Sequence, residues 1–160
     1  MKQSSKGFSL IELLIVVAII LIIAAIAIPS MLRSKLAANE ASAVSSTRTI
    51  LSAEFSYYQT YGGGTDFAQS LTVLGPGSGN TDLIDSALAG GSKTGYLLSV
   101  TASQMSGTSF NEFFISTVPQ AVGISGNRSF CAVEDGAVRF DSTGTAFSGH
   151  DACTAGTSLQ

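Results

Sequence analysis

KGFSLIELLIVVAIILIIAAIAIP, residues Lys6 to Pro29, is almost entirely apolar, yet it contains a carboxylate near its start. Between Leu10 and Ile28, Glu12 is the only charged residue. As a helix, this run would span roughly 28 Å, which is about the thickness of the hydrocarbon core of a bilayer. We expect a helix in spite of the many Ile and Val residues, because a single span in lipid must satisfy its backbone hydrogen bonds internally.

The residues that precede the apolar run predict its orientation. Lys2 and Lys6 come before it and no acidic residue does, so the positive-inside rule places the N-terminus in the cytoplasm and the remainder outside. One alternative is a secretory signal peptide cut after Ala27, but the run is longer than a usual signal peptide core and Glu12 interrupts it. The other is a plain anchor in which Glu12 is incidental. Since a charge in the membrane interior costs roughly 3 kcal/mol, and less near the interface, Glu12 is a functional candidate that lacks a partner.

Residues 7–12, GFSLIE, after a short basic leader, resemble the N-terminus of type IV prepilins. The similarity continues through LLIVVAI and, further on, AAIAIP up to Pro29. The resemblance implies that a prepilin peptidase cleaves between Gly7 and Phe8 and then N-methylates the new amine of Phe8. The leader is lost while the apolar segment stays. The resemblance also implies that Glu12 neutralises the amine of a neighbouring subunit, so that two buried ions pair and set the axial register.

The same resemblance implies the partners and the location of the chain. It implies a homo-oligomeric helical filament on a bacterial surface, supplied from a pool of subunits in the inner membrane by the pilus assembly machinery. Adhesion, twitching motility or DNA uptake would be downstream roles. The net charge of −3 and the pI near 4.9 argue against binding to phosphate backbones, and we expect no sequence-specific nucleic acid partner.

The helix is expected to extend beyond the membrane segment. Pro29 should kink it rather than end it, because apolar residues at helical spacing resume at once; a helix that ends at Pro29 is the alternative. Three consecutive glycines from Gly62 supply the stop. We therefore predict a leader over residues 1–7, a transmembrane or filament-core helix over 8–29, and an amphipathic continuation over 30–61.

Residues 62–160 are rich in Ser, Thr, Gly and Ala and are expected to form a globular domain. A long connection as far as about residue 95 should contain a short helix through Leu88, capped by Thr81 or Asp82. Strands are predicted at Tyr96–Thr101, Glu112–Val118, Ser129–Val133 and Ala137–Phe140, with a hairpin turn at Glu134-Asp135-Gly136. The predicted fold class is α+β, the pilin fold, in which the long helix packs on a four-stranded antiparallel sheet.

Cys131 and Cys153 are the only cysteines. If they lie outside the cytoplasm, a disulfide between them is the default expectation, and the loop that they bound resembles the D-region of pilins. A zinc site of Cys131 with His150 and Asp151, or a calcium site among Glu134, Asp135 and Asp141, matches no usual pattern. We predict no metal site and no cofactor.

The leading interpretation is a structural subunit of a type IV pilus. A type II secretion pseudopilin or a minor pilin is the nearest alternative, although the C-terminal cysteine pair favours a pilin. An enzyme is not expected, because the sequence contains no nucleophile elbow, metal-ligand pair or phosphate loop. A membrane-anchored binding module is a third possibility, and it would keep residues 1–7 and an unmodified start.

Overall fold

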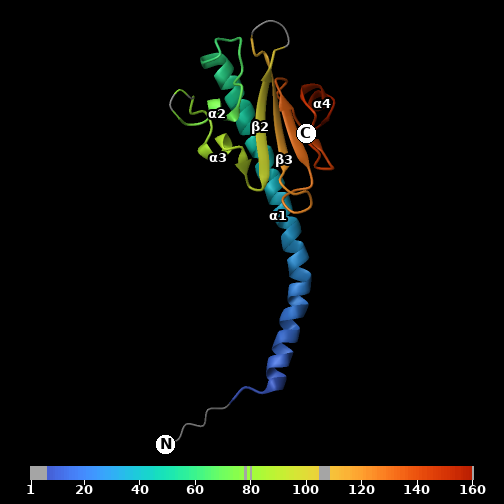
Figure 1. Ribbon diagram of the computed structural model, residues 1–160. Coiled ribbons are helices and arrows are strands. Elements are labelled where there is room, and N and C mark those ends of the chain that lie inside the picture. The colour runs from blue at the N-terminus through green and yellow to red at the C-terminus, as the bar shows by residue number, and fades with distance from the viewer. Residues whose placement is uncertain (1–6, 78, 80, 105–108, 160) are drawn as a thin grey trace, which may run out of the picture. The chain divides into compact units, whose positions relative to one another are not determined.

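The computed structural model describes residues 7–77, 79, 81–104 and 109–159 (Figure 1). The chain divides into two compact units, Met1–Lys35 and Leu36–Gln160. The longest element, helix α1, runs over Leu10–Thr60 and contributes to both.

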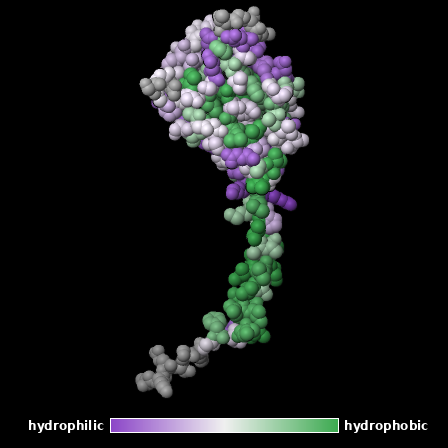
Figure 2. Space-filling view, in the orientation of Figure 1, coloured by the Kyte–Doolittle hydropathy of each residue, from purple (hydrophilic) through white to green (hydrophobic). Residues whose placement is uncertain are grey.

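The part of α1 in the N-terminal unit is apolar and exposed. Its large apolar side chains, from Leu10 to Leu32, are all partly or fully exposed, and Figure 2 shows them as a nearly continuous hydrophobic surface. A helix that is hydrophobic all round is typical of a membrane span or of burial among other helices. The helix continues through Pro29, so the alternative in which it ends there is excluded, while a bend at Pro29 stays a prediction.

The C-terminal unit contains an antiparallel sheet of six strands in sequential order. The strands are β1 (Ser92–Lys93), β2 (Tyr96–Ser103), β3 (Glu112–Pro119), β4 (Ser129–Val133), β5 (Val138–Asp141) and β6 (Thr157–Ser158). The four predicted strands correspond to β2–β5, and the α+β pilin-like class is confirmed. The predicted strand count was wrong because β1 and β6 have two residues each, too few for an alternating pattern to be recognised.

The core of this unit lies between the sheet and the second half of α1. On β3 the residues alternate between buried and half-buried, and Phe113 and Ile115 point into the core. Ile50 of α1 is fully buried in the same cluster. Thr47 and Thr117 form a buried hydrogen bond of 2.9 Å between helix and strand, which gives this apolar interface one satisfied polar contact.

The described part of the unit also contains three short helices: α2 (Leu71–Leu74), α3 (Ser86–Ala89) and α4 (His150–Thr154). The predicted cap of the middle one at Thr81 or Asp82 was wrong. Asp85 caps α3, because its carboxylate accepts a hydrogen bond of 2.8 Å from the Leu88 amide. The hydroxyl of Thr81 instead donates to the carbonyl of Val73. Sequence patterns favour all three capping residues, and the tertiary contact decides between them.

The predicted disulfide is present and joins Cys131 of β4 to Cys153 of α4. Both cysteines are fully buried, in a small cluster that also contains Val133. Because of this cluster and the core on the opposite face, all five residues of β4 are buried. The disulfide therefore holds α4 against the sheet.

Two carboxylates of α1 are buried in contrasting surroundings. Glu40 accepts from the Asn127 amide and pairs with the Arg128 guanidinium at 2.8 Å. Glu54 accepts from the Ala68 amide through Oε2 at 2.9 Å, while its buried Oε1 has no hydrogen-bond partner among the described residues. Burial outweighs the Ala68 hydrogen bond and raises the pKa of Glu54 to about 8, so this carboxyl carries its proton at neutral pH.

Glu54 predicts a pH dependence of stability. In the unfolded chain its carboxyl ionises near 4.5, and in the folded chain near 8. Between these values the folded state binds more protons, so the free energy of unfolding falls as the pH rises and levels off above about 8. The largest decrease that Glu54 can cause in the free energy of unfolding is roughly 5 kcal/mol, since each pH unit contributes about 1.4 kcal/mol. Thermal unfolding of the full-length chain in detergent across this range measures it.

Glu54→Gln should remove most of this decrease, because the amide keeps an acceptor for the Ala68 N–H and does not ionise. Asp82→Asn at an exposed position is the matched control and should retain the native slope. An unchanged slope in Glu54→Gln would contradict the assignment.

The disulfide is expected to contribute to the free energy of unfolding. Replacing both cysteines, Cys131→Ser with Cys153→Ser, opens a loop with a sequence separation of 22 and should lower the free energy of unfolding by roughly 3 kcal/mol. Urea unfolding of the native chain with and without reductant is the comparison, and reductant should have no effect on the double variant. Equal stability of the two chains would show that α4 is held by packing alone.

Candidate functional site

The candidate processing site lies immediately before α1. Gly7, Phe8 and Ser9 have no regular secondary structure, and Phe8 is 87% exposed. A Cβ atom built on Gly7 would meet no other atom within 4 Å. The fold itself therefore does not require a glycine here, and the Gly7–Phe8 bond lies in an accessible, non-helical segment.

Glu12 contacts the backbone at the first turn of α1. Its Oε2 accepts a hydrogen bond of 3.1 Å from the Ser9 amide, and the Ser9 carbonyl accepts from the Leu13 amide at 3.3 Å. With Ser9 as the N-cap and Glu12 three residues later, this is the carboxylate half of a capping box. The negative charge also lies at the positive end of the helix dipole. The sequence identified Glu12, but this contact was missed, although the Ser-x-x-Glu pattern could have indicated it.

Among the described residues, one helix is long and apolar enough to cross a membrane, and it is α1. The criterion is one of length and composition. Glu12 lies in the first turn of this helix, which places it near one end of the apolar segment and not in its middle. Its position is the one in which a carboxylate costs least in a membrane.

The C-terminal unit contains a second polar site, around His150. Its Nε2 lies 2.7 Å from Oε1 of Glu134, and its Nδ1 lies 3.2 Å from Oδ1 of Asp151. Burial lowers the pKa of His150, but the hydrogen bonds to Glu134 and Asp151 and the charges of Glu134 and Glu112 outweigh it, so the pKa is raised above its usual value. The zinc site considered from the sequence grouped His150 and Asp151 with Cys131, whose sulfur is in the disulfide, and it included neither Glu112 nor Glu134.

A comparison with protein-family models matches residues 2–28 to the family described as the prokaryotic N-terminal methylation motif. This is the signal motif of type IV prepilin-like proteins, and the match covers less than a fifth of the 160 residues. No curated protein and no solved structure matches the chain significantly. The chain thus carries the methylation motif that the GFSLIE segment indicated, and its apolar N-terminal helix fits a membrane-anchored precursor.

Proposed function

We propose that this chain is the precursor of a structural subunit of a type IV pilus, held in the inner membrane and then assembled into a helical surface filament. One observation carries the proposal: Glu12, the only charge between Leu10 and Ile28, lies within the methylation motif, four residues after Phe8. A carboxylate in that position can neutralise a cation that is created beside it.

The proposed processing creates that cation. A prepilin peptidase removes residues 1–7 by cleaving between Gly7 and Phe8, and it N-methylates the Phe8 amine. The exposure of Phe8 and the absence of regular structure before Leu10 support access by such an enzyme. The mature subunit then has an apolar helix over residues 8–29, its continuation over 30–61, and the globular part over 62–160.

Elementary electrostatics supports a pairing between Glu12 and the new amine. The ammonium group at Phe8 lies at the positive end of the α1 dipole, where a cation is unfavourable. Among packed apolar helices the penalty for an unpaired ion is several kcal/mol, and removing one partner of a buried pair leaves the other uncompensated. In the proposed filament, Glu12 of one subunit therefore neutralises the amine of its neighbour and fixes the axial register.

In the proposed filament, the C-terminal unit forms the outer layer. It has its own core between the sheet and α1, and its last segment is held by the disulfide. The proposed role is structural and involves no catalytic step by this chain. A type II secretion pseudopilin or a minor pilin would share the processing, and purified surface filaments that contain this chain as the principal component would separate the pilus subunit from both.

The proposed processing determines the native N-terminus. Intact-mass and terminal-peptide mass spectrometry of the chain from its own host membranes should find a protein that begins at Phe8 and carries one methyl group on its amine. Gly7→Val should remain uncleaved, because a branched side chain is placed next to the bond. A native protein that begins at Met1, or at Ile28, would exclude the proposed processing.

Two substitutions separate the capping contact of Glu12 from its proposed pairing with the amine. Glu12→Ala removes both the acceptor for the Ser9 amide and the charge, whereas Glu12→Gln keeps an acceptor and removes only the charge. If neutralisation drives assembly, both variants should be processed and found in the membrane but should yield at least tenfold fewer filaments in sheared surface material viewed by electron microscopy.

Glu12→Asp is the matched control, since it retains the charge, and it should assemble better than Glu12→Gln. Normal filaments from Glu12→Gln would show that the capping contact suffices and would refute the pairing. Loss of processing in that variant would point instead to recognition by the peptidase.

A further inference from the structure

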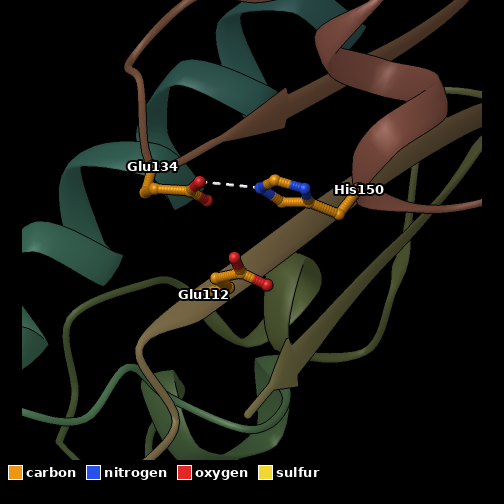
Figure 3. A group of neighbouring side chains, drawn as sticks. All are labelled: Glu112, Glu134 and His150. Atoms are coloured by element: carbon orange, nitrogen blue, oxygen red, sulfur yellow. Dashed lines mark hydrogen bonds and ion pairs between the residues drawn. The ribbon is translucent and has the colours of Figure 1, made fainter. Parts of the chain in front are cut away.

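Three side chains from separate parts of the C-terminal unit converge at one end of the sheet. Glu112 is the first residue of β3, Glu134 follows the last residue of β4, and His150 is the first residue of α4. One ligand atom from each, a carboxylate oxygen or an imidazole nitrogen, lies within 4.8 Å of the others. Figure 3 shows the two carboxylates and the imidazole directed toward one another.

The register of the sheet and the disulfide bring these residues together. Phe114 of β3 pairs with Val133 of β4, so the beginning of one strand lies beside the end of the other. The face that carries Phe114 and Val133 packs against the disulfide cluster beneath α4. Cys153 lies three residues after His150, and its bond to Cys131 fixes α4 over this face. The three side chains are thus positioned by elements that cannot easily separate.

The contacts of the two flanking residues orient the cluster. Asp151 lies 3.2 Å from Nδ1 of His150, the arrangement in which a carboxylate holds the imidazole so that Nε2 is the free ligand. Ser103 donates a hydrogen bond of 3.3 Å to Oε2 of Glu112. Similar outer contacts are a regular feature of metal-binding histidines and carboxylates in proteins.

The polar atoms of the cluster are not fully satisfied within the described part of the chain. Oε2 of Glu134 is buried and has no hydrogen-bond partner there. With Nδ1–H directed to Asp151, the Nε2 lone pair of a neutral His150 faces the Glu134 carboxylate at 2.7 Å. A positive charge, either the second imidazole proton or a bound metal ion, satisfies these two acceptors and the nearby carboxylate of Glu112.

We propose that Glu112, Glu134 and His150 bind one divalent transition-metal ion, for which Zn²⁺ is the best fit. One imidazole nitrogen and two carboxylate oxygens are a donor set that Zn²⁺ accepts, and three protein ligands leave a fourth position for water. Ca²⁺ and Mg²⁺ take oxygen ligands in larger number, so the imidazole disfavours both. An open pocket lined by Glu112, Ser148, Gly149 and His150 gives the ion a path from solvent.

The test is calorimetric titration of ZnCl₂ into the full-length, oxidised chain in detergent, purified without a polyhistidine tag and freed of metal with EDTA. We expect saturable binding of one Zn²⁺ per chain and no comparable binding of CaCl₂. His150→Gln and Glu134→Gln should each weaken the Zn²⁺ affinity at least tenfold. Asp151→Asn, which removes the carboxylate that accepts from Nδ1 of His150, should weaken it by about tenfold.

Asp85→Asn is the matched control, because Asp85 pairs with Lys93 away from the cluster, and its affinity should equal that of the native chain. Co²⁺ in place of Zn²⁺ should give the visible absorption of a four-coordinate ion, and His150→Gln should abolish it. Absence of one-to-one Zn²⁺ binding, or an affinity unchanged in both His150→Gln and Glu134→Gln, would overturn the proposal.

A thiol assay shows whether each variant retains the Cys131–Cys153 disulfide. If a variant at His150 or Glu134 loses it, Glu112→Gln decides, because Glu112 lies outside the disulfide cluster. A tenfold loss of affinity in that variant supports the site, and native affinity refutes the proposed donor set.

Discussion

The carboxylate of Glu12 is the constraint on which the N-terminal half of this chain depends. Every other residue between Leu10 and Ile28 is uncharged, so this one side chain determines in which environments the helix can be buried. In the precursor it accepts from the Ser9 amide and lies at the positive end of α1. A lone ion is tolerated there because the backbone itself stabilises negative charge at that end. The proposed pairing with the amine of a neighbour adds a second use to the same oxygens.

The C-terminal unit also contains buried carboxyl groups, and two of them are stabilised in different ways. Glu40 is compensated by Arg128 and a backbone amide, whereas Glu54 is stabilised mainly by keeping its proton. The sheet packs on α1 through the buried residues of β3, which alternate along the strand. The disulfide extends this ordered region to α4, whose sequence is short and polar, and which contributes only Cys153 to the buried residues.

Much of this arrangement could be predicted from the sequence. The long helix and four of the six strands follow from periodicity and turn residues, the disulfide from the two cysteines and the expected topology, and the methylation motif from one specific segment. The two-residue edge strands could not be predicted, since alternation needs several residues to be visible. The cap of α3 was misplaced because Thr81, Asp82 and Asp85 are all good capping residues, and only tertiary contacts select Asp85. The cluster of Glu112, Glu134 and His150 was missed because its members are separated along the chain and meet only through strand register and the disulfide.

The Ser9–Glu12 contact determines whether the proposed cleavage would disturb the start of α1. Both residues lie on the C-terminal side of the proposed cleavage site, so the hydrogen bond that caps α1 would remain in the mature chain. Removal of residues 1–7 would then create the charged amine of Phe8 without a rearrangement of the backbone at the start of α1. In a subunit held in the bilayer, the first turn of α1 would already be formed, and incorporation into a filament would require docking without a folding step at this end.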